Sequence, residues 1–98
     1  MNEAQKKVQS FCKKNNLSSS VEHRVLDVLS ELGELSKEIL KASSYGKSSY
    51  VFNEKIKLEL GDVLFSLITL ANSLDVNLDV ALEAVLKKYE KRIENLDL

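Results

Sequence analysis

The sequence contains no proline, and only three of its 98 residues are glycine. Proline breaks a helix interior and glycine costs about 1 kcal/mol there, so their scarcity favours long helices over a β-rich or disordered chain. The most apolar stretch covers only residues 63–71, far short of the ~20 residues that span a bilayer. We therefore expect a soluble, helix-rich protein without a membrane span.

Cysteine and histidine are also scarce, because Cys12 and His23 are the only residues of their types. A single thiol cannot form an intramolecular disulfide, which is typical of a reducing compartment, and no signal-peptide pattern opens the chain. Zinc sites and di-iron bundles need several Cys or His ligands, so both are disfavoured. We expect a cytoplasmic protein in which any metal site is built from carboxylates.

Charge and length bound the remaining possibilities. The 14 basic and 15 acidic side chains give a formal charge of −1, so no basic excess exists to hold a polynucleotide. A length of 98 residues allows one domain, residues 1–98. A domain of this size buries only about two-thirds of its unfolded surface, so association of several copies would supplement a thin core.

Apolar residues recur at helical spacing in four segments. They predict helices over residues 2–14, 20–41 and 54–75, and a fourth that follows Asn77 and runs to residue 96. Asn53 and Asn77 are suitable N-caps for the last two. The third helix is almost wholly apolar after Asp62, so it should be central and buried. The predicted fold class is all-α, a four-helix bundle-like domain in an oligomer.

The connection over residues 42–52 is rich in serine and long for a compact bundle. Two interpretations stay open for it, a flexible crossover and a lid over a site. Its aromatic residues Tyr45, Tyr50 and Phe52 could stack on a base or pack against the bundle.

Carboxylates gather on one face of the second predicted helix, where they are spaced three or four residues apart: Asp27, Glu31, Glu34 and Glu38. On the third predicted helix, Glu59 and Asp62 share a thin polar strip. A partly buried charge without a partner costs several kcal/mol, so these acids need compensation. One acidic pair alone is usually a solvated face, but two pairs on neighbouring helices supply the oxygen ligands that Mg²⁺ or Mn²⁺ needs.

Each acidic pair encloses a glycine, Gly33 in the first pair and Gly61 in the second. Each glycine costs about 1 kcal/mol within a helix. We expect that cost to be offset by a close approach of the two helices.

The order Glu31-Leu-Gly-Glu34, a gap of 24 residues, and then Glu59-Leu-Gly-Asp62 resembles the Glu-x-x-Glu and Glu-x-x-Asp motif of MazG-like nucleotide pyrophosphohydrolases. The likeness extends from residue 21 to residue 92 and is to short, single-domain members. It includes the Tyr45-Gly46 loop, the Leu64–Ile68 segment, the helix start at Asn77 and the basic segment of residues 88–92. The chain departs from many members in lacking a tryptophan-containing segment before the second helix.

The resemblance implies an all-α enzyme that cleaves a nucleoside or deoxynucleoside triphosphate between its α- and β-phosphates. The products would be the monophosphate and pyrophosphate, and the role would be sanitation of the nucleotide pool. Mg²⁺ is the implied cofactor, with Mn²⁺ as a substitute. The implied metal ligands are the four acids of the motif, Glu31, Glu34, Glu59 and Asp62.

The resemblance also implies phosphate contacts from Lys88 and Arg92, reaching across a subunit boundary. Glu34 and Glu38 are the candidates for the catalytic base that accepts a proton from the attacking water. The implied partner is a second copy of the chain, in a homodimer or a dimer of dimers with the third helices near the interface. Neither a polynucleotide nor a membrane is expected as a partner.

A different class of function remains open, because steps of three and four on the second and fourth helices also describe coiled-coil seams. The alternative is a non-enzymatic helical interaction module, or a metal-binding module that has lost catalysis. An interaction module explains the apolar stripes but not the acids.

Overall fold

The computed structural model describes residues 1–96, which form four α-helices and no strand. The helices are α1 (Glu3–Lys14), α2 (Val21–Ala42), α3 (Glu54–Ser73) and α4 (Leu78–Leu96). The predicted all-α class is confirmed, and each predicted helix is present to within two residues at either end. The predicted domain, residues 1–98, includes two positions that lie outside the described residues.

Side-chain caps start the helices, as the short polar residues before them require. Asn53 Oδ1 accepts a hydrogen bond from the Ile56 amide at 3.0 Å. Asn77 Oδ1 accepts one from the Asp79 amide at 2.9 Å. Both predicted caps are therefore confirmed, and they fix where α3 and α4 begin.

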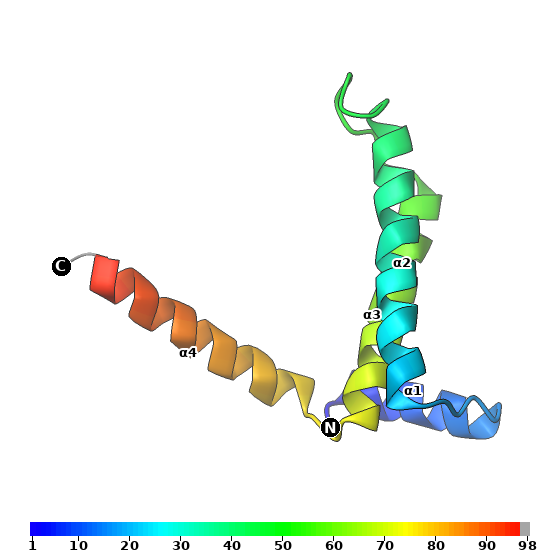
Figure 1. The fold of residues 1–98 in the computed structure, drawn as a ribbon, viewed down its shortest axis with the longest axis vertical. Helices are drawn as coiled ribbons and strands as arrows, with labels where there is room; N and C mark the ends of the chain where they lie inside the picture. The colour runs from blue at the N-terminus through cyan, green and yellow to red at the C-terminus, as the bar shows by residue number, and fades with distance from the viewer. Residues whose placement is uncertain (97–98) are drawn as a thin grey trace.

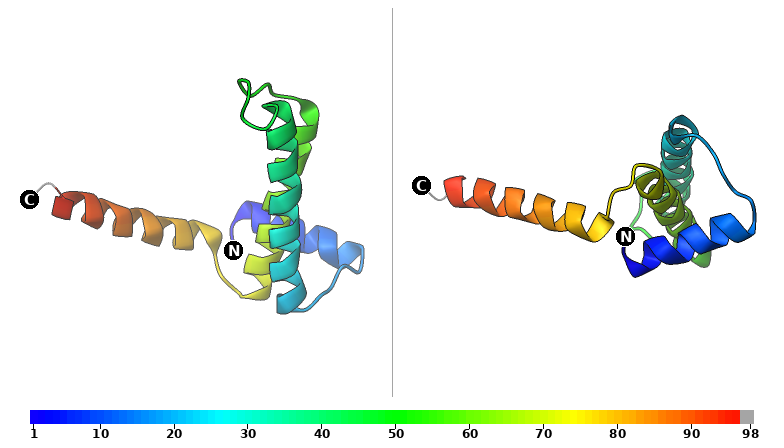
Figure 2. Two further views of the ribbon diagram at one scale, coloured as in Figure 1. Left: turned by 45° about the horizontal axis from the view of Figure 1, so that its top comes forward. Right: turned by 90° about the horizontal axis from the view of Figure 1, so that it is seen from below.

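The packed part of the chain is built around α3, as the sequence predicts, but the predicted burial of this helix is only partly found, since Leu58 and Leu60 are more than half exposed. α2 and α3 form an antiparallel pair, and α1 crosses α3 near the end of that pair that lies away from the α2–α3 connection (Figures 1 and 2). The buried side chains of α3 are Ile56, Ser66, Ile68, Thr69 and Ala71. Phe11 of α1 meets Phe65 of α3 edge to face, with ring centroids 6.0 Å apart, which joins α1 to this core.

The fourth helix does not complete a bundle within one chain. α4 leaves α3 at a bend of 99° and projects away from the other three helices (Figures 1 and 2). Within residues 1–96 it packs along none of them. The four-helix bundle prediction is therefore wrong for the single chain. The apolar period of α4 predicts that one face is covered, but it carries no information about which chain covers it.

The chain is correspondingly extended, with much apolar surface in contact with solvent. Its radius of gyration is 16.9 Å, whereas a compact chain of this length has about 13 Å. Among residues 1–96, three apolar side chains are buried: Ile56, Ile68 and Ala71. Large apolar residues of α2, α3 and α4 are more than half exposed, for example Leu29, Leu64 and Leu82. Patches of this kind mark surfaces that bind another molecule.

The connection between α2 and α3 joins the neighbouring ends of the antiparallel pair (Figure 1). Its aromatic residues Tyr45, Tyr50 and Phe52 are exposed, so the helices of the same chain do not bury them. Among the described residues, no single helix is long and apolar enough to cross a membrane. α3 and α4 taken together, bent by 99°, meet that criterion by length and composition alone.

Candidate metal centre

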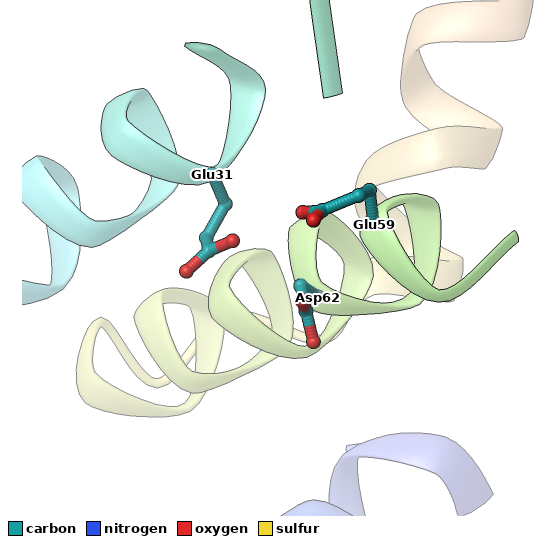
Figure 3. A group of neighbouring side chains, drawn as sticks. All are labelled: Glu31, Glu59 and Asp62. Carbon is teal, nitrogen blue, oxygen red and sulfur yellow. The ribbon is translucent and has the colours of Figure 1, made fainter. Parts of the chain in front are cut away.

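Three carboxylates converge between α2 and α3. Glu31 extends from α2 toward Glu59 and Asp62 of α3 (Figure 3). One oxygen from each of the three side chains lies within 4.8 Å of the other two. Glu59 and Asp62 share a face of α3 because they are three residues apart, and the antiparallel packing of α2 presents Glu31 to that face. We call these three residues the carboxylate cluster.

The electrostatics of the carboxylate cluster are unfavourable for three negative charges. Glu31 and Glu59 are half-buried, and Asp62 is exposed. Partial burial raises the pKa of the Glu31 carboxyl above its ordinary value of 4.5, and the neighbouring acids raise it further, first Asp62, then Glu59, Glu34 and Asp27. The ion pairs among residues 1–96 use other acids, namely Glu3, Glu38 and Glu54. No basic side chain of the described chain therefore compensates the cluster.

The donor set of the cluster fits a small, hard cation. Carboxylate oxygens are the ligands that Mg²⁺ and Mn²⁺ prefer. Two ligands on opposite sides of a Mg²⁺ ion are about 4.2 Å apart, and the cluster oxygens already lie within 4.8 Å of one another. Small side-chain movements would therefore bring all three to one ion.

The fourth predicted ligand, Glu34, is not among the three converging residues. It lies on α2 one turn beyond Glu31 and is exposed. It is nevertheless close enough for its negative charge to contribute to the raised pKa of Glu31. The single chain thus brings three of the four predicted ligands together and leaves the fourth beside them.

The predicted phosphate contacts are on the projecting helix. Lys88 and Arg92 are exposed on α4, and both lie over the ring of Tyr89, at 5.3 and 5.6 Å from its centroid. α4 points away from α2 and α3, the helices that carry the carboxylate cluster (Figures 1 and 2). One chain therefore does not bring its own Lys88 and Arg92 to that cluster.

Comparison with known proteins places this arrangement in a family. The family model of the MazG nucleotide pyrophosphohydrolase domain matches residues 19–96, which includes the whole carboxylate cluster and α4. The chain belongs to the MazG nucleotide pyrophosphohydrolase family. The four helices of this MazG chain agree with the all-α fold that the resemblance implies.

Two solved structures are similar to this MazG chain. One is the crystal structure of a Bacillus-conserved MazG protein described as a nucleotide pyrophosphohydrolase, with 32% identity, a TM-score of 0.74, and coverage of 89% of this chain and 85% of that one. The other is the crystal structure of YPJD from Bacillus subtilis, with 32% identity, a TM-score of 0.76 and coverage of 94% of each chain. That coverage extends over most of α4 as well as the packed helices.

One sequence relative is similar to this chain over a shorter span. The uncharacterized protein YpjD of Bacillus subtilis strain 168 is 42% identical over 65 residues, which is 63% of this chain and 57% of the relative. The matched part is therefore somewhat more than half of that protein's length.

One predicted site residue of the MazG chain has an unexpected environment. Glu38, a candidate base, is only 7% exposed. Its Oε1 lies 3.3 Å from Lys55 Nζ on α3 and 3.7 Å from Lys41 Nζ on its own helix. This pair joins α2 to α3 about one turn beyond the carboxylate cluster. In the sequence, Lys55 is four residues before Glu59 and Glu38 is four residues after Glu34, but these spacings alone do not pair the two residues, because the pair requires the register of α2 against α3.

The expected role of the two helix glycines is not found within the chain. A Cβ atom built on Gly33 or Gly61 would meet nothing within 4 Å. Neither glycine therefore allows a close contact between α2 and α3, and that prediction is wrong for the single chain. Both glycines are exposed, on surface that a second chain could cover.

We predict that Glu31→Gln stabilises the metal-free protein. The raised pKa of Glu31 means that its ionisation opposes folding increasingly as the pH rises above 4.5. The variant should therefore melt at the wild-type temperature well below that pH and about 2–6 °C higher at pH 7, which corresponds to at most about 1 kcal/mol in a domain of this size. Thermal denaturation in EDTA across this pH range measures the difference.

The same melting experiment with Mg²⁺ separates repulsion from metal binding. Mg²⁺ should raise the melting temperature of the wild type and of Glu83→Gln, a control on the polar face of α4, but not that of Glu31→Gln. Equal stabilisation of all three proteins by Mg²⁺ would show that Glu31 takes no part in binding the ion.

Proposed function

We propose that this MazG chain is a Mg²⁺-dependent nucleoside triphosphate pyrophosphohydrolase. It would cleave a nucleoside or deoxynucleoside triphosphate between the α- and β-phosphates, releasing the monophosphate and pyrophosphate, in a role of nucleotide pool sanitation in the cytoplasm. The observation that carries the proposal is the carboxylate cluster, three acids from two helices without a basic partner in residues 1–96. The family match supports the reaction class.

Glu31, Glu59 and Asp62 would hold the metal, with the nearby Glu34 as a fourth ligand. When bound, Mg²⁺ or Mn²⁺ supplies positive charge for the phosphate oxygens and lowers the pKa of a coordinated water. Glu31 and Glu59 lie within helices rather than on a loop, and both are half-buried, which restricts their side chains. A substrate would therefore meet a site whose geometry is largely set before it binds.

The ion pairs favour one of the two candidates for the catalytic base. The carboxylate of Glu38 already accepts contacts from Lys55 and Lys41 in a buried position. Glu34 is exposed beside the cluster, and its carboxylate takes part in none of the ion pairs found among residues 1–96. Glu34 is thus better placed to accept a proton from the attacking water, whereas Glu38 holds α2 and α3 together.

A triphosphate brings about four negative charges to a site that is already acidic, so basic side chains must assist. Lys88 and Arg92 cannot reach the cluster of their own chain while α4 projects. We propose that they reach the cluster of a second copy, in a homodimer or a dimer of dimers. The exposed apolar stripe of α4, which includes Leu82, Tyr89 and Ile93, would then be covered by that copy.

A metal-binding module without catalysis would keep the carboxylate cluster and lack the reaction. An interaction module would keep only the apolar surfaces. Hydrolysis and metal binding, measured separately, distinguish the three functions.

We predict that Glu59→Gln lowers kcat/KM for triphosphate hydrolysis by at least about 100-fold, because the change removes a ligand charge and keeps the side-chain shape. Pyrophosphate release from a panel of nucleoside triphosphates with Mg²⁺ measures the effect, with Glu83→Gln as the control that keeps wild-type turnover. Wild-type turnover in Glu59→Gln would refute the role of this carboxylate. Release of orthophosphate by the wild type would refute the proposed bond cleavage.

We also predict that two inactive variants complement each other. Glu59→Gln disables the cluster and Arg92→Ala disables α4, so a mixed dimer would contain one site with both parts intact. Unfolding and refolding an equimolar mixture should restore about a quarter of wild-type activity, since half of the dimers are mixed and each has one working site.

The control mixture pairs Glu59→Gln with Glu31→Gln, which damages the cluster of every chain and should recover nothing. Lys87→Ala, on the polar face of α4, should keep full activity alone. Sedimentation showing a stable, active monomer, or mixtures that stay inactive, would contradict a site shared between chains.

A further inference from the structure

Gln5 of α1 is the one large side chain among residues 1–96 that is fully buried, with 0% exposure. A buried amide is costly unless all its hydrogen-bonding groups have partners. Gln5 lies where α1 meets the connection between α3 and α4, residues 74–77, which we call the elbow. A polar residue at the most buried position of a small protein indicates a specific requirement for its hydrogen bonds.

The side-chain amide of Gln5 is bound on every side. Its Nε2 donates to Asn72 Oδ1 at 3.0 Å and to the Val76 carbonyl at 2.8 Å. Its Oε1 accepts from the Leu78 amide at 2.8 Å and from the Asn2 amide at 3.3 Å. Two donors and two acceptor positions are the full capacity of a glutamine side chain.

These partners come from both arms of the elbow. Asn72 belongs to the last turn of α3, and Leu78 is the first residue of α4. Two further bonds reinforce the connection, from Asn72 Nδ2 to the Gln5 carbonyl at 3.1 Å and from Asn2 Nδ2 to Asp79 Oδ1 at 3.0 Å. The first turn of α1 therefore binds the end of α3 and the start of α4 simultaneously.

The elbow controls the direction of α4, because within residues 1–96 α4 packs along no other helix. Arg92 is 14 residues beyond Leu78, which corresponds to about 21 Å along the helix. A change of about 20° at the elbow would therefore move Arg92 by roughly 7 Å. Hydrogen bonds to phosphate tolerate far smaller displacements.

We propose that Gln5 is a positioning residue whose buried amide network holds α4 at the angle that presents Lys88 and Arg92 to the carboxylate cluster of a second chain. The inference rests on the proposed function for the site that α4 serves. The elbow angle itself is a property of the folded chain, and it can be measured without hydrolysis.

The test uses the full chain with Cys12→Ser and spin labels at exposed positions. Labels at residues 37 and 87 report the distance from α2 to α4, and labels at 37 and 57 report the distance from α2 to α3. Labelled protein is diluted with unlabelled protein so that each distance lies within one chain. The variant is Gln5→Met, which keeps the volume and removes the four bonds, and the matched control is Gln9→Met, which lies one turn further along the same side of α1 and is exposed.

We expect Gln5→Met to broaden or shift the α2–α4 distance and to leave the α2–α3 distance unchanged. KM for the triphosphate should rise about tenfold or more. The Mg²⁺ concentration that gives half of the maximal rise in melting temperature should stay at the wild-type value. Gln9→Met should match the wild type in all three measurements. If Gln5→Met does not fold, Asp79→Ala removes the exposed bond from Asn2 Nδ2, keeps the cap that Asn2 Oδ1 provides for α1, and should shift the α2–α4 distance in the same direction.

An unchanged α2–α4 distance in the folded variant would overturn the proposal. Loss of Mg²⁺ binding together with a change in both distances would also overturn it, because Gln5 would then support the whole fold rather than the elbow. If the wild type releases no pyrophosphate, the proposed function fails and the positioning role fails with it, whereas the distances still show whether Gln5 fixes the elbow.

Discussion

The packing of α2 against α3 is the constraint on which the site depends. It places Glu31 opposite Glu59 and Asp62, and no basic side chain of residues 1–96 pairs with any of them. Two ionised groups about 4 to 5 Å apart repel by roughly 1 kcal/mol in water and several-fold more in a less polar surrounding. The helix pair holds them together through the apolar contacts of α3 and through the Glu38–Lys55 ion pair. A divalent ion bound between the three carboxylates would replace this repulsion with attraction to its positive charge.

A single chain supplies only part of what the proposed reaction needs. Its carboxylate cluster lies on the packed helices, whereas Lys88 and Arg92 lie on a helix that leaves α3 at 99°. The same helix exposes Leu82, Leu86 and Ile93, which no other helix of residues 1–96 covers. Assembly of two chains would then cover the exposed apolar side chains of α4. It would also bring Lys88 and Arg92, which lie on the same helix, to a carboxylate cluster.

The sequence predicts local structure and the members of the cluster well. The periodic apolar positions, with Asn53 and Asn77 as caps, locate the helices. The two acidic spacings select four carboxylates, of which three converge in the structure and the fourth, Glu34, lies beside them. These features depend on residues close together in the chain, so they are readable without knowing how the helices pack.

What the sequence does not show depends on packing between distant segments. The ion pair of Glu38 with Lys55 requires the register of α2 against α3, and the direction of α4 requires the geometry of the elbow. Gln5 reads as an ordinary polar residue of the first helix, because three of its four side-chain partners lie at least 67 residues away and only Asn2 is near in sequence. Gly33 and Gly61 were expected to serve α2–α3 contact, yet both face outward, where only the assembled protein could give them a role.

The most direct test of the account is anomalous diffraction from crystals of the full chain grown with Mn²⁺ and a non-hydrolysable triphosphate analogue. The account predicts a manganese peak bounded by the carboxylates of Glu31, Glu59 and Asp62, with the analogue's phosphates beside it. An ordered analogue with no peak at these three side chains, or manganese bound only elsewhere, would contradict it.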